Sequence, residues 1–280
     1  MKTMFLRFPG GKAKAITLSY DDGVQQDIQL IEIMRRHGLK GTFNINAGCI
    51  APDGTVYPKD RISRRLTESQ MLSAYPEDIC EIACHGYTHE FMNHCNSAVV
   101  CNEVLEDRKA LEAMFERPIH GMAYPFGPFN DTVVSALPMT GIWYSRTTVS
   151  TEKFEIPTDW LRMPATCHHK NPRLMELAEN FLQMAPTRDA KLFYLWGHSY
   201  EFERDNNWNV IEEFASLMGN HDDIWYATNM EIYLACRDYQ RLETSADGSM
   251  IHNPSIRSVW LANRQGETFE ILPGATMKLS

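Results

Sequence analysis

Two short stretches of the chain carry side chains that bind metals and move protons. Asp21 and Asp22 stand side by side before Gly23, and His89 follows His85 by four positions. Apolar residues precede each stretch, which predicts that buried strands deliver them. Two imidazoles and one carboxylate form a three-ligand set with an open coordination position, as in catalytic zinc sites. We therefore expect a metal centre in which the remaining aspartate is free to act as a base.

Each stretch taken alone also has an ordinary structural interpretation. An Asp-Asp-Gly triplet is common in surface turns, and a pair of histidines four residues apart often binds nothing. Two neighbouring carboxylates after a buried strand nevertheless repel each other, and in extended backbone they would point to opposite faces. A turn at Gly23 lets both face one cavity, where a divalent ion takes up their charge.

The elements that must position these residues alternate between strands and helices. Apolar runs and period-2 patterns predict strands at residues 15–18, 41–46, 81–84, 119–123, 142–144, 191–196 and 224–226. Helical spacing predicts helices at residues 26–37, 67–75, 97–115, 130–137, 172–184, 208–218 and 230–241. This alternation indicates an α/β fold of parallel βαβ units, and about seven or eight strand–helix pairs suggest a barrel with its chemistry at the carboxyl ends of the strands.

The helix expected at residues 97–115 has the strongest pattern in the chain. Its buried face is expected to consist of Val99, Val100, Val104, Leu105, Leu111 and Met114.

Residues 243–280 differ in character from the preceding chain. Asp247-Gly248 is a hairpin signal, and short strands are expected at 249–252, 256–262 and 268–272. About 38 residues are marginal for an independent core. We expect residues 1–242 to form the barrel and residues 243–280 to form a small β appendage packed on it.

The amino-acid composition gives no indication that the chain binds nucleic acid or crosses a membrane. The 280 residues carry a net charge of -9 without a run of Lys or Arg, so nothing suggests nucleic acid. No stretch approaches the roughly 20 apolar residues of a membrane span. Seven cysteines without framework spacing suggest free thiols and a reducing compartment, so we expect a cytoplasmic protein. The sequence leaves open whether the chain forms a homo-oligomer.

These stretches resemble the polysaccharide deacetylases of the NodB-homology type, carbohydrate esterase family 4. The first motif of that family stands here at residues 19–23, the second at 85–89, and the fifth, an apolar strand ending in histidine, at 192–198. The resemblance implies a distorted barrel of seven or so strands and the hydrolysis of an acetyl group from a carbohydrate. It also implies that Asp22, His85 and His89 hold Zn²⁺ or another divalent ion such as Co²⁺, Ni²⁺ or Fe²⁺.

The same resemblance implies the roles of the other site residues. Asp21 would be the base, His198 the acid, and the backbone N–H of Phe126 an oxyanion donor. The third motif departs from the family, because Ala123 stands where an arginine orients the catalytic aspartate. Arg146 is the candidate substitute, and a surface arginine is an equally good interpretation of it.

The fourth motif of the family contains Asp-Trp, which stands here as Asp159-Trp160. By resemblance Asp159 would hydrogen-bond the catalytic histidine and Trp160 would wall the pocket. A helix-capping aspartate beside a core tryptophan is the alternative. His168 and its neighbour His169 would either line the pocket or add a metal ligand, and we favour the pocket. Tyr124 and Trp196 complete the expected substrate pocket.

The hypothesis is a metal-dependent hydrolase that removes acetyl groups from an N-acetylated sugar or glycan. One alternative is the same site acting on an O-acetyl ester or another amide. A second is a non-catalytic carbohydrate-binding protein on the same scaffold, which the missing arginine favours. A third is a non-haem iron oxygenase with a similar ligand triad, although such enzymes usually have a β jelly roll that this chain does not resemble.

Overall fold

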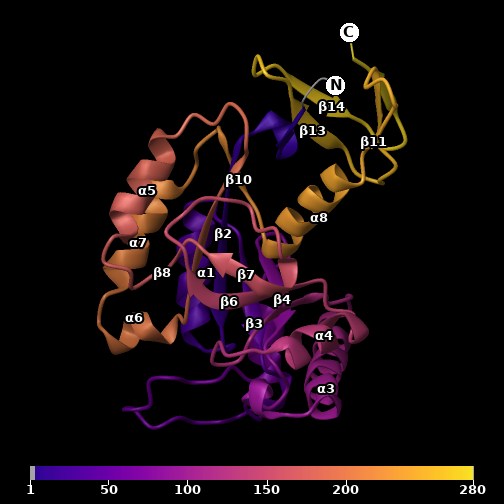
Figure 1. Ribbon diagram of the computed structural model, residues 1–280. Helices are drawn as coiled ribbons and strands as arrows, with labels where there is room; N and C mark the ends of the chain where they lie inside the picture. The colour runs from indigo at the N-terminus through magenta and orange to yellow at the C-terminus, as the bar shows by residue number, and fades with distance from the viewer. Residues whose placement is uncertain (1–3, 280) are drawn as a thin grey trace.

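A single parallel sheet organises the molecule (Figure 1). Within residues 4–279, which the computed structural model describes, nine strands pair in the order β7-β6-β5-β4-β3-β2-β9-β8, with β10 also beside β2. The strands are β2 (Lys14–Asp21), β3 (Gly41–Ile45), β4 (Cys80–Cys84), β5 (Gly121–Ala123), β6 (Tyr144–Ser150), β7 (Met163–Ala165), β8 (Cys167–His168), β9 (Lys191–Gly197) and β10 (Ile224–Tyr226). The expected α/β fold is confirmed.

One continuous segment joins the two edges of this sheet. β7 pairs with β6, and β8 pairs with β9 at the other end of the strand order. Thr166 is the only residue between β7 and β8, and its N–H donates to the carbonyl of Tyr194 on β9 at 2.9 Å. The sheet therefore curls round to its own first edge, which gives the distorted barrel expected from the sequence.

Helices cover the outside of the sheet. They are α1 (Gln26–Arg36), α2 (Glu68–Ala74), α3 (Ser97–Phe115), α4 (Asp131–Met139), α5 (Leu174–Gln183), α6 (Tyr200–Arg204), α7 (Trp208–Met218) and α8 (Asn229–Gln240). Short 3₁₀ turns lie at η1 (Pro9–Gly11), η2 (Ala47–Cys49), η3 (Met92–His94) and η4 (Trp160–Arg162). Capping boxes at Thr67 and Thr228 begin α2 and α8, and Asn96 caps α3.

The central strand β2 is buried at all eight of its positions, because helices cover one face and the barrel interior covers the other. Its even-numbered residues, such as Ile16 and Tyr20, belong to the larger apolar cluster beneath the helices. Ala15 belongs to a second cluster with Trp196 of β9. Because side chains alternate between faces along a strand, Asp21 continues the series of Ala15 and lies on the interior face.

Two small antiparallel sheets form the C-terminal appendage, drawn in yellow beyond the end of α8 in Figure 1. β13 (Val259–Ala262) pairs with β14 (Thr268–Ile271), and β12 (Met250–His252) pairs with β11 (Glu243–Thr244) and β15 (Thr276–Lys278).

The first of these sheets has a third strand from the other end of the chain. β1 (Phe5–Arg7) pairs with β13, so the appendage expected from residues 243–280 also recruits residues 5–7. A domain boundary at residue 242 stays a prediction.

Two sequence-based expectations about local structure were wrong. The strand expected at 142–144 begins only at Tyr144 and continues through a run of β-branched residues to Ser150, so Arg146 lies inside it. On α3, Val99 is 42% exposed although we expected it on the buried face. Neighbouring helical positions point about 100° apart, so Val99 cannot share the face of fully buried Val100.

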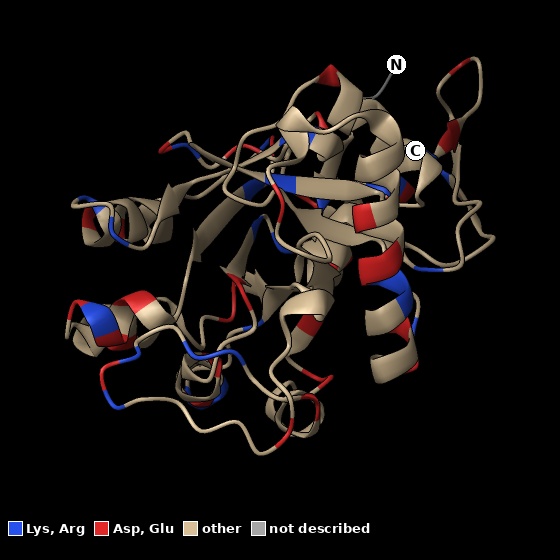
Figure 2. Ribbon diagram, turned by 90° about the horizontal axis from the view of Figure 1, so that it is seen from below, with Lys and Arg blue, Asp and Glu red and all other residues tan. Residues whose placement is uncertain are grey.

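The structure also shows how the charged residues and the cysteines are distributed and whether any helix could cross a membrane. Acidic and basic residues are interspersed along the ribbon (Figure 2). All seven cysteines are free. Among the described residues, no helix combines the length and the apolar character needed to cross a membrane.

The two neighbouring valines of α3 provide a matched test of the core. Val100→Ala should lower the free energy of unfolding by about 2 kcal/mol, because it removes buried carbon atoms and leaves a cavity. Val99→Ala should change it by less than about 0.5 kcal/mol, since that side chain is partly in water. Urea unfolding followed by circular dichroism measures both variants, and equal losses would contradict the packing of α3.

Candidate active site

The two aspartates separate at the end of β2. Asp21 is the last residue of the strand, and Asp22 has φ of 88°, a left-handed conformation that is rare for a residue with a side chain. The N–H of Asp22 still donates to the carbonyl of Asn44 on β3 at 2.9 Å. The chain therefore turns one residue before Gly23, and this early turn lets neighbouring carboxylates approach the same pair of imidazoles.

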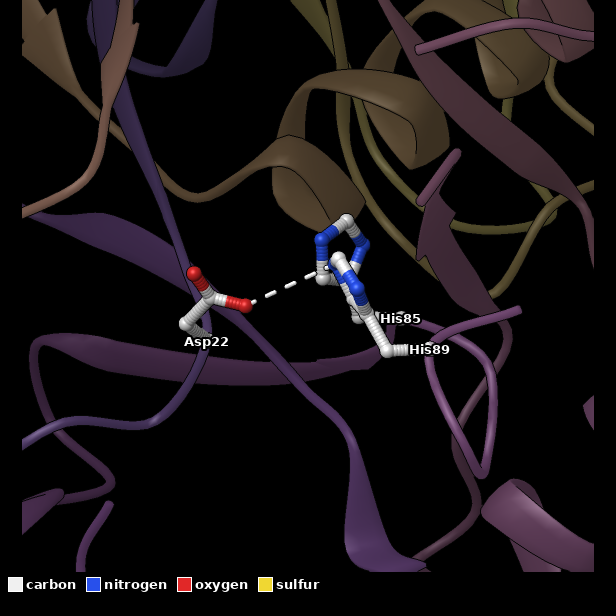
Figure 3. Close-up of side chains that lie close together, drawn as sticks. All are labelled: Asp22, His85 and His89. Carbon is white, nitrogen blue, oxygen red and sulfur yellow. Dashed lines mark ion pairs between the residues drawn. The ribbon is translucent and has the colours of Figure 1, made fainter. Parts of the chain in front are cut away.

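Asp22, His85 and His89 bring one potential ligand atom each within 4.8 Å of one another (Figure 3). The close-up shows the Asp22 carboxylate opposite the two rings, and His89 Nε2 lies 3.6 Å from Asp22 Oδ1. His85 Nδ1 lies 2.9 Å from the carbonyl oxygen of Ala123, so Nδ1 carries the proton and Nε2 is left as a ligand atom. This donor set fits a divalent transition metal such as zinc.

Electrostatics keeps the imidazoles neutral. Burial lowers the pKa of His85, and it lowers that of His89 to about 4 with a further contribution from His85. Neutral imidazole is the form that binds metals. Arg65 lies against the same centre, because its Nη2 is 3.0 Å from Asp22 Oδ1 and its Nη1 donates to the Asp22 carbonyl. We did not foresee Arg65 from the sequence, since it follows a loop without a motif.

Two acidic residues on the buried face of α3 hold the loop that carries the histidines. Asp107 accepts hydrogen bonds from the backbone N–H of Ala47 at 2.7 Å and of His85 at 2.8 Å. Glu103 accepts from the N–H and the hydroxyl of Thr88, both at 2.8 Å. Their signal in the sequence was an acidic residue at two core-facing positions, one helical turn apart, where apolar residues are usual.

Arg146 lies against Asp21. Its Nη2 is 2.5 Å from both carboxylate oxygens of Asp21, and the guanidinium is fully buried over the ring of Trp196, 4.5 Å from the centroid. Asn44 donates to Asp21 Oδ1 at 2.8 Å. Burial would raise the pKa of Asp21, but Arg146 and two nearby imidazoles outweigh it and hold that pKa well below the usual range.

The register of the sheet explains how Arg146 stands in for the missing arginine. Ala123 on β5 is the direct partner of Arg146 on β6. Paired residues on adjacent parallel strands point to the same face of the sheet. A guanidinium that starts one strand further along therefore still reaches the interior, where Asp21 lies.

His198 directly follows β9, which pairs with β2 on the side away from β3. Its Nε2 is 3.8 Å from Asp21 Oδ2, and its Nδ1 is 3.5 Å from Oε2 of Glu201, three residues later. Burial would lower the pKa of His198, but Glu201 and the two aspartates raise it above the ordinary value. Glu201 was missed in the sequence; it lies on the short helix α6, and His198 lies in the loop between β9 and that helix.

Asp159 and Trp160 occupy different places from those expected. Asp159 caps the 3₁₀ turn η4 by accepting from the N–H of Leu161 at 3.0 Å, and it pairs with Arg162 at 2.9 Å. Its described contacts do not include His198, whose carboxylate partner is Glu201 instead. Trp160 packs edge-on against Tyr233 in the second apolar cluster. The alternative of a helix cap beside a core tryptophan describes this pair.

The remaining pocket candidates are divided between surface and interior. Phe126 has φ of 59° and is 50% exposed, with its ring stacked on Phe91 and 4.2 Å from that of His89. Tyr124 is buried, and its hydroxyl donates to the Leu161 carbonyl at 2.6 Å.

His168 and Trp196 lie near His198. Their rings meet edge-on at 4.5 Å, and the ring centroids of His168 and His198 are 6.3 Å apart.

Comparison with known proteins places this geometry in context. Residues 9–144 match the family model for polysaccharide deacetylase. A bifunctional xylanase/deacetylase from Pseudobutyrivibrio xylanivorans is 23% identical over 156 residues, which are 49% of this chain but only 22% of that protein. The chain thus spans about a fifth of the length of this curated relative.

Solved structures share the fold at low identity. A putative polysaccharide deacetylase from Mycobacterium smegmatis has a TM-score of 0.58 at 14% identity, covering 86% of this chain and 96% of that one. The carbohydrate esterase domain of a multidomain xylanase from the hindgut metagenome of Trinervitermes trinervoides has a TM-score of 0.51 at 17% identity, covering 79% and 90%. The match over residues 9–144, just under half of the chain, confirms the resemblance to the polysaccharide deacetylases that the motifs indicated.

Proposed function

We propose that the chain is a metal-dependent deacetylase that hydrolyses the acetamide of an N-acetylated sugar or short glycan. The observation that carries this proposal is the division of labour between two neighbouring aspartates. Asp22 faces the paired imidazoles, while Asp21 is held in its ionised form by Arg146. A hydrolase needs both a metal ligand and a free base at such a centre.

Asp22, His85 and His89 would hold the ion. When bound there, a divalent ion such as Zn²⁺ lowers the pKa of a coordinated water and polarises the acetyl carbonyl. Zinc fits the nitrogen-rich donor set, and Co²⁺, Ni²⁺ and Fe²⁺ accept the same ligands. The Ala123 carbonyl fixes the tautomer of His85, so that its free nitrogen faces the other two ligands.

The chain's own groups would move the protons. Asp21 takes a proton from the attacking water, and Arg146 and Asn44 keep its carboxylate oriented. The N–H of Phe126 donates to the developing oxyanion. His198 gives its proton to the departing amine, and the carboxylate of Glu201, 3.5 Å from Nδ1, favours the protonated form of the ring.

Removal of the metal is the first test. Dialysis against a chelator should abolish acetate release from N-acetylated sugars, and added Zn²⁺ or Co²⁺ should restore it. Asp21→Asn should still bind metal at Asp22, His85 and His89 but lose about a hundredfold or more in kcat, because the base is gone. Metal analysis and acetate release measure the two properties separately. Full activity of Asp21→Asn would refute the assignment of the base.

The register between β5 and β6 allows a test by relocation. Arg146→Ala should lower kcat by about a hundredfold, because Asp21 loses its orientation. Ala123→Arg added to that variant returns the cation to the strand position typical of the family. The kcat of the double variant should be at least about tenfold higher than that of Arg146→Ala alone, because paired positions on adjacent strands face the same interior. Steady-state kinetics compares the variants, and Ala123→Lys serves as a control for charge without the planar fork.

A matched pair of carboxamide substitutions tests which carboxylate serves His198. Glu201→Gln should lower kcat by about tenfold or more, because a neutral amide no longer favours the protonated imidazole. Asp159→Asn should leave kcat within about twofold, since surface changes away from the site have small effects. Steady-state assays measure both variants. A loss of kcat in Asp159→Asn without a loss in Glu201→Gln would instead identify Asp159 as the carboxylate partner of His198.

A further inference from the structure

A second group of metal-type ligands lies on the other side of His198. The ligand atoms of His168, His198 and Glu201 lie within 4.8 Å of one another. They come from the end of β8, the loop after β9 and the short helix α6. His168 Nε2 is 3.1 Å, and His198 Nδ1 is 3.5 Å, from the same oxygen, Oε2 of Glu201.

Hydrogen bonding alone explains this convergence poorly. Charge-assisted bonds between nitrogen and carboxylate oxygen are about 2.7–2.9 Å long, shorter than either separation here. Oε2 of Glu201 and Nδ1 of His198 are buried, yet neither has a hydrogen-bond partner of good geometry among the described residues. In a tetrahedral zinc site with bonds of about 2.0–2.1 Å, ligand atoms are about 3.3 Å apart. The observed separations of 3.1 and 3.5 Å bracket that value.

The charged side chains around Glu201 determine how tightly a metal ion would bind at this site. Lys170 and Arg204 lie 3.3 and 2.9 Å from Oε1, the other oxygen of Glu201. These cations oppose the binding of a further positive charge. Around Oε2, the ionic contacts among the described residues come from imidazole rings and not from lysine or arginine. His169 is 3.2 Å from Oε2 on its buried side and steadies the carboxylate. A metal ion should therefore bind here more weakly than at Asp22, because each donor set holds one carboxylate but two cations contact Glu201 and only Arg65 contacts the side chain of Asp22.

We propose that His168, Nδ1 of His198 and Glu201 form a second site for a zinc-class divalent ion, and that this ion inhibits the enzyme. An ion on Nδ1 takes the place of the Nδ1 proton, and the Nε2–H that remains on a metal-bound neutral imidazole is a much weaker acid than the Nε2–H of an imidazolium, so His198 protonates the leaving amine poorly. The ion also engages Glu201, which then no longer favours the protonated form of the ring. Binding at this site stands by itself, whereas its inhibitory effect rests on the proposed deacetylase function.

Isothermal titration of the metal-free full chain with Zn²⁺ tests the binding. We expect two equivalents for the wild type, the second weaker than the first, and one equivalent for either Asp22→Ala or His168→Ala. The variant carrying both substitutions should bind none. His252→Ala, a change in the appendage, controls for surface histidines and should bind two. A single equivalent for the wild type, or two for His168→Ala, would overturn the proposal.

Activity measured at rising Zn²⁺ tests the inhibition. The rate of the wild type and of His252→Ala should fall by about a hundredfold as the second site fills, the effect expected from losing a general acid. His168→Ala, compared with its own rate at one equivalent, should not be inhibited in that range. Equal inhibition of all three would disprove the inhibitory role. If no variant hydrolyses acetylated sugars, the deacetylase proposal fails while the titration still decides the site.

Discussion

A buried ion pair between Arg146 and Asp21 underlies the arrangement of the whole site. Both side chains are almost without contact with water, and a charge in such a place is tolerated only with a partner. Removing one partner of a buried pair typically costs about 3–5 kcal/mol, because the other charge is left uncompensated. The pair also fixes which aspartate is ionised and oriented, and it leaves Asp22 to the histidines.

The barrel interior makes this pair possible by becoming polar toward one end. Ala15 of β2 packs among apolar side chains, Thr17 donates to Asn229 at 3.0 Å, and Ser19 accepts from Asn44 at 2.9 Å. Asp21 is the next residue on the same face. The side chains of Thr17, Ser19 and Asp21 each have a hydrogen-bond partner on a neighbouring element, so polarity increases along the interior face of β2 while the larger apolar cluster lies on the other face. Stability and chemistry thus use opposite faces of one strand.

The fold could be predicted from the sequence because alternating strands and helices leave strong periodic signals. The convergence of Asp22, His85 and His89 was predictable as well, since all three stand in motifs directly after strands. Arg146 could be named only as a candidate, because its role depends on strand register, which no local pattern reveals. Asp159 was misplaced for the same kind of reason, since a dipeptide cannot show that its carboxylate caps a turn.

Residues that support the site from other elements were the hardest to foresee. Glu201 serves His198 from a helix of only five residues, and Asp107 reaches the histidine loop from the buried face of α3. Both are charged side chains in largely buried positions, where local propensity predicts nothing about their partners. Their function follows from distances that only the folded chain defines.

The joining of the sheet edges between β7 and β8 has a consequence for the order of assembly. Asp22, His85 and His89 depend on β2, β3 and β4, which are neighbours in both sequence and space. Cys167–His168 takes its place only when a late segment pairs with β9. In a chain synthesised from its N-terminus, the strands that carry these three residues therefore emerge before the β7–β8 segment and its partner β9.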